Sequence, residues 1–281
     1  MESVLRQKEI GFKLEKILVV SDGSKDNTVK LAKSLKHKKI EVIAYLKRIG
    51  KSSRYNKIYK SLTTDILIQS DADVVLSGQY VLSNVIRPLI KHKAVVLTSG
   101  NSKPVASKTF TEFAVNKTVE AYQEMRTSLR GGHNIFCVTG ELLASKKEFV
   151  KKIVIPVTMI ADDTYMYLKC ISKGYKFRFV PSAVIKFRSV QTLPDQIRQN
   201  TRFESAQLRF KKYFPSELVD REYYVPSALL WSCRFKQFIQ YPIHSLYIYA
   251  VNTYCRLRSR SVESKLDAQW SIAGTTKRFS Q

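Results

Sequence analysis

The sequence has little cysteine and histidine, and neither residue type forms a cluster. Its four cysteines (Cys137, Cys170, Cys233 and Cys255) lie far apart, and no two of them form a Cys-x-x-Cys pair. We therefore expect buried, reduced thiols and neither a disulfide framework nor a zinc site. The four histidines are equally scattered, so we expect no histidine-based metal site.

Two kinds of segment that direct a chain to or through a membrane are also missing. The opening Met1-Glu2-Ser3 leads into a charged segment and lacks the pattern of a signal peptide. No apolar run approaches the ~20 residues that a membrane-spanning helix needs. We therefore expect the protein to be cytoplasmic, in a reducing compartment.

Acidic residues are few beside basic ones. The chain has 23 Asp and Glu against 48 Lys and Arg, so its net charge is +25. Such a charge favours anionic partners, which include nucleotide phosphates, anionic lipid headgroups and nucleic acid. The basic residues are dispersed and no nucleic-acid motif is present, so we expect no nucleic-acid partner. A Rossmann dehydrogenase and a P-loop are disfavoured because neither glycine fingerprint follows a predicted strand.

The sequence does show an alternation of apolar strands and helices. Short β-branched runs stand at residues 16–21, 40–45, 65–70 and 94–99, with helical patterns at 26–37, 51–62 and 79–91 between them. This alternation indicates an α/β protein with a mainly parallel sheet and helices on both faces. A helix at 110–128, a strand-like run at 135–138 and a helix starting at Pro194 follow. From Val225 onward the sequence is aromatic and basic, without strand signals.

Acidic residues stand at the ends of these predicted elements. Asp71-Ala72-Asp73 directly follows one apolar strand, Ser21-Asp22-Gly23-Ser24 follows another, and Asp162-Asp163 opens a helix. Carboxylate oxygens suit hard divalent cations, which also accept diphosphate oxygens as ligands. The helix dipole favours acidic residues at a helix start, which is the alternative explanation for either member of the Asp162-Asp163 pair. The other explanation is a general base for an acceptor hydroxyl.

Two basic segments accompany the acidic ones. Gly50-Lys51 follows Arg48 and precedes a helix, which places a turn and cations where phosphates can bind. Gln199 and Arg202 are three residues apart and share a helix face, and arginine suits bidentate phosphate recognition. Phe203 either stacks on a ligand or enters the core. Taken alone, each segment is better explained by an exposed basic helix.

Together these segments resemble the family 2 glycosyltransferases with the GT-A fold. The segment from Val19 to Thr28 is similar to the family's DDGSxDxT strand end, and Arg48 to Asn56 to its RxGKxxALN segment. Asp71-Ala72-Asp73 matches its DxD element, Asp162-Asp163 its ED pair, and Gln199 to Phe203 its QxxRW helix. The resemblance covers residues 3–210.

The resemblance implies a site and a reaction. Asp163 would be the catalytic base, and Asp71 and Asp73 would hold Mg²⁺ or Mn²⁺. The residues that would bind the nucleotide-sugar are Asp22, Lys51, Asp71, Gln199, Arg202 and Phe203. The implied reaction is inverting transfer from a UDP- or GDP-sugar, with the metal stabilising the departing diphosphate.

The sequence departs from the family pattern in three places. Ser21 replaces the first Asp of the DD pair, and Phe203 replaces Trp while it retains an aromatic face. The family's first strand, with its P-x-x-N-E turn, is missing, so we expect either that the true start lies upstream or that this is an N-terminally shortened form. Because that strand lies inside the sheet, its loss threatens stability and nucleotide affinity. The alternative function is therefore a non-catalytic homologue that binds a glycan or lipid surface.

We divide the chain into a GT-A domain at residues 1–215 and a C-terminal helical segment at residues 216–281. The stretch from Phe235 to Tyr254 is apolar and aromatic, with basic residues on both sides. That mixture suits either a monotopic anchor in an anionic membrane interface or a helix that packs back on the domain. The QxxRW resemblance implies a polysaccharide or lipid-linked acceptor. We therefore expect a peripheral enzyme at the inner face of the cell membrane.

Overall fold

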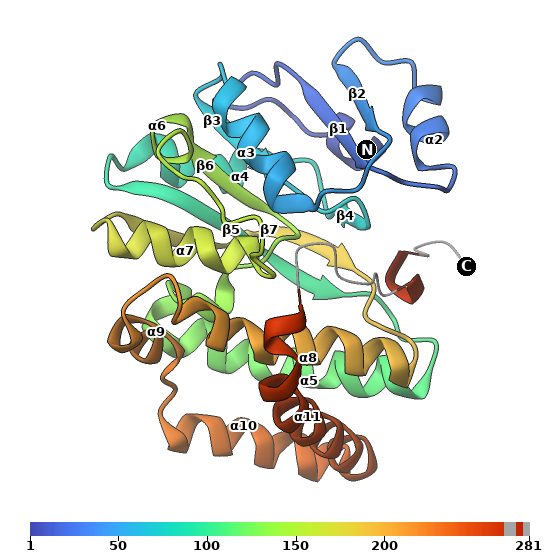
Figure 1. Cartoon of the computed structure of the whole chain (residues 1–281), viewed down its shortest axis with the longest axis vertical. Helices are drawn as coiled ribbons and strands as arrows, with labels where there is room; N and C mark the ends of the chain where they lie inside the picture. The colour runs from blue at the N-terminus through green and yellow to red at the C-terminus, as the bar shows by residue number, and fades with distance from the viewer. Residues whose placement is uncertain (267–273, 278–281) are drawn as a thin grey trace.

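Strands and helices alternate through the first two thirds of this computed structural model, which describes residues 1–266 and 274–277 (Figure 1). The elements begin with α1 (Glu2–Leu5), β1 (Ile17–Asp22), α2 (Thr28–Ser34), β2 (Ile40–Tyr45), α3 (Lys51–Ser61), β3 (Ile66–Gln69), β4 (Val74–Leu76), α4 (Val81–Lys91) and β5 (Val95–Pro104). They continue with α5 (Phe110–Ser128), η1 (Leu129–Gly132), η2 (Ile135–Cys137), β6 (Leu143–Lys146), α6 (Lys147–Val150), α7 (Asp162–Ser172) and β7 (Lys176–Phe187).

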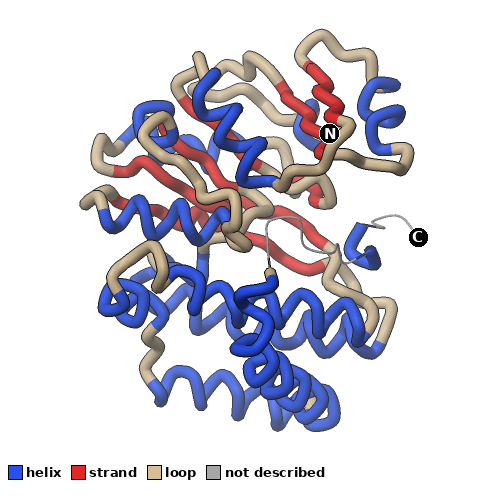
Figure 2. The backbone as a smooth tube through the Cα atoms, in the orientation of Figure 1, coloured by secondary structure: helices blue, strands red, loops and turns tan. Residues whose placement is uncertain are grey.

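The C-terminal part is helical. It consists of α8 (Leu193–Phe210), α9 (Ser216–Tyr223), α10 (Ser227–Gln240), α11 (Pro242–Val262), η3 (Glu263–Lys265) and η4 (Gly274–Lys277). Helices α8, α9, α10 and α11 gather with α5 below the strands in Figure 2, where α8 packs along α11 and α5 along α10. Among the residues that the structure describes, no helix combines the length and the apolar character needed to cross a bilayer.

The β-structure is interrupted. The larger sheet has the order β3-β6-β5-β7-β4, and β1 pairs in parallel with β2 in a separate ribbon. β5 and β7 are parallel at the centre, whereas β6 is antiparallel to β3 and β5, and β4 is antiparallel to β7. Within residues 1–266 no backbone pairing joins β1 to β3, and Figure 1 shows the two strands apart, near α3.

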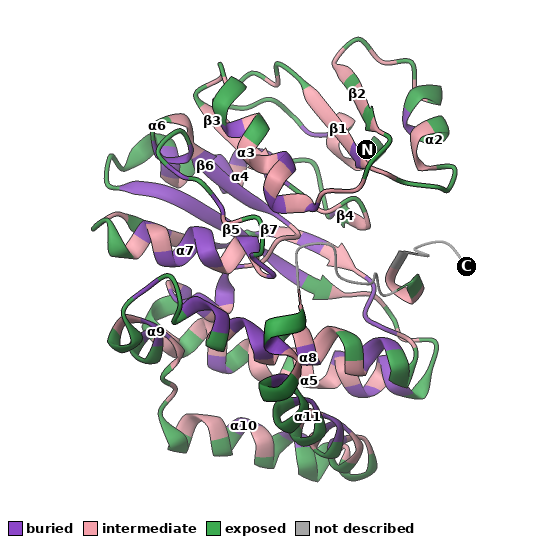
Figure 3. Ribbon diagram, in the orientation of Figure 1, coloured by how far each residue is buried: buried purple, intermediate pink, exposed green. Residues whose placement is uncertain are grey.

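Two clusters of buried side chains cover the larger sheet. α4 packs on β5 and β7, where Val85 and Leu89 are buried with Ile185. A second cluster joins α7 to the sheet through Met166 and Phe177. Figure 3 shows β5 and β6 largely buried, whereas β1 and β2 are mostly half-buried. The predicted α/β fold class, a sheet with helices on both faces and a helical extension after it, is confirmed.

The local predictions differ in outcome. The helix predicted at residues 110–128 is α5, and the helix predicted to begin at Pro194 is α8, whose first turn Thr192 caps. The strand predicted at residues 135–138 is wrong, because Ile135–Cys137 forms a short 3₁₀ helix. The Asn134 side chain accepts a hydrogen bond from the Phe136 N–H at 2.9 Å, and such local capping competes with strand pairing.

Candidate active site

The predicted site residues line one large cavity. Its volume is about 2580 Å³, and it is bounded by both parts of the sheet and by α3, α7 and α8. Small-molecule pockets in proteins usually measure ~300–1,000 Å³. The cavity is larger because an acidic cluster and a long apolar region between β1 and β3 share it.

Lys51 stands at the centre of the acidic cluster. Its Nζ atom lies 2.7 Å from Asp71 Oδ1 and 3.6 Å from Asp162 Oδ2. Burial lowers the pKa of Lys51, but the charges of Asp162 and Asp71 outweigh burial and raise the pKa well above its usual value. Lys51 therefore remains a fixed positive charge beside the carboxylates.

Asp22 holds the turn that positions Lys51. Its carboxylate accepts hydrogen bonds from the Gly50 N–H at 2.7 Å, the Ile49 N–H at 3.1 Å and Arg54 Nε at 2.7 Å. Gly50 has a φ of 93°, a conformation that glycine adopts at little cost. Partial burial raises the pKa of Asp22, but these hydrogen bonds outweigh burial and lower it. In this structure Asp22 acts on the site through the turn.

Arg54 is a residue of this site that sequence analysis missed. Its side chain is only 7% exposed, and its guanidinium carbon lies 3.4 Å from the centre of the Tyr45 ring. It also donates a hydrogen bond to the Lys47 carbonyl oxygen at 2.6 Å. Arg54 stands where the RxGKxxALN pattern has alanine, so the pattern carried no signal for its ion pair with Asp22.

Asp162 and Asp163 open α7 next to Lys51. Asp162 is buried, and Asp163 Oδ1 accepts a hydrogen bond from the Thr164 N–H at 2.7 Å. Burial, together with the charge of Asp162, raises the pKa of Asp163 to about 6. Asp163 is thus ionised at neutral pH yet binds a proton more tightly than an ordinary aspartate, which suits a general base.

The acidic groups converge around Gly140. A Cβ atom built on this glycine would lie 3.4 Å from Lys51 Nζ and 3.5 Å from both Asp163 Oδ2 and Asp71 Oδ2. The three side chains come from the start of α3, the start of α7 and the loop after β3. Because Gly140 has no side chain, it leaves open a small space that Asp163, Lys51 and Asp71 all face.

Glu141 is a second residue that sequence analysis missed. Burial, with a contribution from the charge of Asp71, raises the pKa of Glu141 to about 7. The Ser70 hydroxyl donates a hydrogen bond to its backbone oxygen at 2.8 Å and ties the turn to the loop that carries Asp71. Glu141 precedes a strand, whereas the acidic residues predicted from the sequence follow a strand or open a helix. Its position therefore gave no signal.

The predicted Gln199, Arg202 and Phe203 line the same cavity from α8. Burial lowers the pKa of Arg202, and the charges of Asp163 and Asp162 act in the opposite direction. The Arg202 guanidinium carbon lies 5.0 Å from the centre of the Phe203 ring, which is 51% exposed. Phe203 therefore faces outward and does not enter the core.

Asp73 lies where η4 approaches the site. The Thr276 hydroxyl donates a hydrogen bond to Asp73 Oδ2 at 3.4 Å, and the Thr275 N–H and hydroxyl donate to Asp195 Oδ2 at 3.1 and 2.6 Å. No group of three or more His, Cys, Asp or Glu side chains suited to a metal is found in residues 1–266 and 274–277. The carboxylates of Asp71 and Asp73 are oxygen donors suited to a hard cation that takes its other ligands from a substrate.

This geometry defines a class of protein, an α/β protein with carboxylates and a half-buried lysine gathered where strands end and helices begin. A model of glycosyl transferase family 2 matches residues 1–154 of the 281 residues. The chain belongs to glycosyl transferase family 2. A search of curated proteins found no match to the chain.

Solved structures share the fold. A mannosyltransferase from Pyrobaculum calidifontis, in complex with GDP-Man and Mn²⁺, is 16% identical with a TM-score of 0.55, over 92% of this chain and 68% of that chain. Glucosyl-3-phosphoglycerate synthase from Mycobacterium tuberculosis, in complex with Mg²⁺ and UDP, is 14% identical with a TM-score of 0.53, over 74% of this chain and 73% of that chain. At these identities the likeness shows the GT-A fold alone.

Proposed function

We propose that the chain is an inverting glycosyltransferase that uses a UDP- or GDP-sugar with Mg²⁺ or Mn²⁺. The observation that carries this proposal is the convergence of Lys51, Asp71 and Asp163 on the space beside Gly140. Family membership and the nucleotide and metal complexes of the two structural relatives support it. The acceptor would be a polysaccharide or a lipid-linked glycan at a membrane surface.

The positive groups would stabilise the diphosphate. Asp71 and Asp73 would hold the divalent cation, which neutralises charge on the departing diphosphate when it is bound. Lys51 supplies a second fixed charge beside Asp71, and Arg202, from the QxxRW-like helix, supplies a third at the wall formed by α8. Arginine can also orient phosphate oxygens through paired hydrogen bonds.

Asp163 would accept the proton of the acceptor hydroxyl. As the acceptor oxygen bonds to the anomeric carbon, the bond from that carbon to the diphosphate oxygen breaks, and its electron pair leaves with the diphosphate. A single displacement of this kind inverts the anomeric configuration. With its pKa raised to about 6, Asp163 is mostly ionised at neutral pH and is a stronger base than an exposed aspartate.

A thermal-shift titration tests donor binding. UDP and GDP are added with and without Mn²⁺ to the native chain, to Asp73→Asn and to Asp65→Asn, a control whose side chain is 96% exposed. A nucleotide at 100 times its dissociation constant adds about 2.7 kcal/mol of stability. We expect a Mn²⁺-dependent shift for one nucleotide that Asp73→Asn loses and Asp65→Asn retains. The proposal fails if a folded native chain shows no shift.

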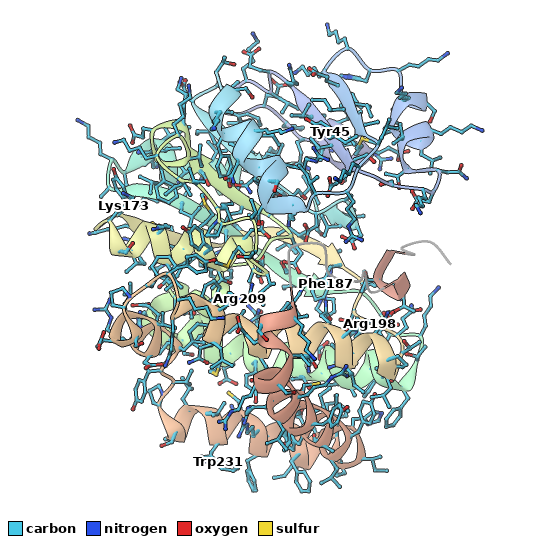
Figure 4. The ribbon with its side chains drawn as sticks, viewed as in Figure 1. Tyr45, Lys173, Phe187, Arg198, Arg209 and Trp231 are labelled. Carbon is cyan, nitrogen blue, oxygen red and sulfur yellow. The ribbon has the colours of Figure 1, made fainter. Side chains whose placement is uncertain are left out.

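The C-terminal segment, residues 216–281, would hold the enzyme at the inner face of the membrane. α11 buries Ile248 and Cys255 against the rest of the protein and presents an apolar outer side together with α10. The side chains of this outer surface that are at least 60% exposed are Trp231, Phe235, Ile239, Ile243, Leu246 and Leu257. Trp231 marks the outer edge of α10 in Figure 4, and exposed arginines follow Cys255 on α11. Apolar and basic side chains together suit an anionic bilayer surface.

Vesicle flotation tests this attachment. We expect the chain to float with phosphatidylcholine vesicles only when these contain phosphatidylglycerol, and the double variant Trp231→Ser, Phe235→Ser to lose flotation. Leu31→Ser with Leu46→Ser is the matched control, because these leucines are also exposed, at 64% and 102%, on a different part of the chain. Equal loss of flotation in both double variants would contradict attachment through the outer surface of α10 and α11.

The second candidate function is a non-catalytic homologue that binds a glycan or lipid surface. The interrupted sheet favours it, since we propose that the family's first strand has no counterpart among the residues that the structure describes. This candidate predicts a folded chain that does not turn over the donor. It also predicts that Asp163→Asn binds the glycan or lipid surface as the native chain does.

A further inference from the structure

The large cavity has a further part, which lies between the larger sheet and the helices α5 and α8 below it in Figure 1. We call it the α5–α8 lobe and define it by six of its lining residues: Val115 and Val119 of α5, Arg188 and Ser189 after β7, Gln196 of α8 and Ile248 of α11. The sugar transfer proposed above gives none of these six residues a role.

A contact between two helices closes one side of the lobe. Asn200 of α8 donates a hydrogen bond to Asn252 of α11, and a second bond near the ends of the same helices shows that they run in the same direction. Gln196 and Ile248 each stand four residues before this asparagine pair, so they lie next to each other one helical turn earlier.

Ion pairs leave the lobe electrically neutral. Arg188 pairs with Glu112 at 2.8 Å, and both side chains are buried. Glu112 stands one turn before Val115, so this pair lies against the wall that α5 forms. Arg198 of α8 pairs with Asp195 at 2.7 Å. Because each of these cations has its own carboxylate, the lobe favours a neutral ligand over a phosphate or a carboxylate.

Three polar atoms of the lobe have no partner. Arg188 Nε, Ser189 Oγ and Gln196 Oε1 are buried and make no hydrogen bond to the part of the chain that the structure describes. The three side chains are only 6%, 3% and 3% exposed. Such atoms are rare in proteins, because nothing compensates the loss of their hydration. They comprise a donor, a hydroxyl and an acceptor, which together match the hydroxyl groups of a ligand.

Apolar side chains form the rest of the lobe. Val115 and Val119 stand one turn apart on α5, and Ile248 is buried on α11. A ligand that fits therefore has hydroxyl groups together with an apolar face of carbon–hydrogen groups. A few fixed polar groups on an apolar wall are the usual way in which a pocket orients a small molecule. A pyranose ring has both kinds of surface.

The lobe joins the reacting space along α8. Gln196, Gln199 and Arg202 are each three residues apart and share one face of the helix. The charges of Asp163 and Asp162 act on Arg202 across the cavity. The six residues from Gln196 to Arg202 span about 9 Å of helix. This is farther than one sugar ring reaches, so a ligand that fills the lobe and also reacts at Asp163 has at least two sugar units.

We propose that the α5–α8 lobe binds a neutral sugar unit of the acceptor that precedes the unit whose hydroxyl reacts. This inference rests on the proposed sugar transfer and gives the acceptor a class, a neutral glycan of two or more units. Arg188 Nε and the Ser189 hydroxyl donate hydrogen bonds to sugar oxygens, and Gln196 Oε1 accepts one from a sugar hydroxyl. Val115 and Val119 cover the apolar face of the ring.

Sugar binding to the full chain, measured by NMR saturation transfer, tests the proposal without donor or turnover. The neutral probes are maltotriose, cellotriose, mannotriose and galactotriose, each compared with its monosaccharide. Trigalacturonate is the anionic counterpart of galactotriose, and about 0.15 M salt screens the net charge of +25. We expect at least one neutral trisaccharide to bind at least about tenfold more tightly than its monosaccharide, and trigalacturonate to bind no more tightly than galactotriose.

Two variants place the binding in the lobe. Ser189→Ala and Gln196→Leu each remove a buried atom that has no hydrogen-bond partner in the described chain, so we expect neither to unfold at a lower temperature. Each should weaken binding of the trisaccharide at least about fivefold. Ser145→Ala is the matched control, because its hydroxyl is also buried without a described partner but does not line the cavity. We expect it to bind the trisaccharide as the native chain does.

Each contrary outcome overturns the proposal. Lower unfolding temperatures of both lobe variants would mean that these groups hold the fold. Equal weakening by Ser145→Ala would mean that binding does not depend on the lobe, and tighter binding of trigalacturonate would mean an anion site. If no trisaccharide binds to a chain that shows the nucleotide-dependent thermal shift, the lobe proposal fails and the sugar transfer stands. If a trisaccharide binds but no nucleotide does, the sugar transfer fails and the lobe remains the glycan site of a non-catalytic homologue.

Discussion

Substituting alanine for Gly140 should separate catalysis from folding. The added methyl would lie 3.4 to 3.5 Å from Lys51 Nζ and from the carboxylates of Asp163 and Asp71, which is ordinary van der Waals contact. The φ of Gly140 is outside the left-handed region, and such replacements stabilise a fold by about 0.4–1 kcal/mol. The same methyl takes the space that the reacting atoms need. Misplacement of reacting atoms by about 1 Å costs about 10²-fold in rate, or ~2.7 kcal/mol.

The assay measures release of UDP or GDP from a panel of nucleotide-sugars, beside thermal unfolding of the same samples. Gly100→Ala is the matched control, because its Cβ would lie 2.4 Å from Ile185 Cδ1 and 2.8 Å from the Ala183 oxygen. Overpacking of that kind costs about 1–3 kcal/mol. Gly100→Ala should therefore unfold at a lower temperature than the native chain, whereas Gly140→Ala should not. Full turnover by Gly140→Ala would refute the placement of the reaction beside this glycine.

Three further predictions concern charges. Asp163→Asn should keep metal-dependent nucleotide binding, measured by calorimetry, and lose transfer; retained transfer would overturn the assignment of the base. Arg54→Ala should lower the free energy of unfolding in urea by about 3 kcal/mol, because it leaves a partly buried carboxylate without its cation; an unchanged midpoint would contradict this. Burial raises the pKa of Glu263, but hydrogen bonds from Lys212 and Arg209 outweigh burial and lower it. This carboxylate therefore stabilises the fold above its usual pKa near 4.5, and the contribution is lost as the pH falls through its lowered folded-state value. Glu263→Gln should unfold below the native temperature at about pH 7 and at a similar temperature at about pH 3, and a constant difference would exclude the titration.

The parts of the fold that local sequence signals specify were predictable. α5 and α8 begin at Thr109 and Thr192, whose side chains cap the first turn, and their periodic apolar faces follow. Asp71 and Asp163 were found because each stands at an element end. The family model matches residues 1–154, which include Asp71 but not Asp163, and the roles of both residues stay predictions.

The parts that depend on distant pairing were not predictable. Glu141 comes beside Asp71 only because β3 pairs with β6, and the Ser70–Glu141 hydrogen bond spans 71 residues. The Arg54–Asp22 pair spans 32 residues and joins a helix to a strand end. Neither residue has a local pattern that distinguishes it from an ordinary charged side chain. The 3₁₀ turn at Ile135–Cys137 was missed for a similar reason, since Asn134 also donates to the Arg126 and Leu129 carbonyls.

Arg209, labelled near the end of α8 in Figure 4, has a mechanical consequence. It is buried and bonds to Glu263 and to the Leu266 and Thr158 carbonyl oxygens, so it clamps the end of α11 to α8. Further along the same two helices, Asn200 donates a hydrogen bond to Asn252. α8 and α11 are thus joined at two points, and we expect them to move together. A force on the outer side of α11 would therefore shift α8 and move Arg202 relative to Asp162 and Asp163, whose charges act on it across the cavity.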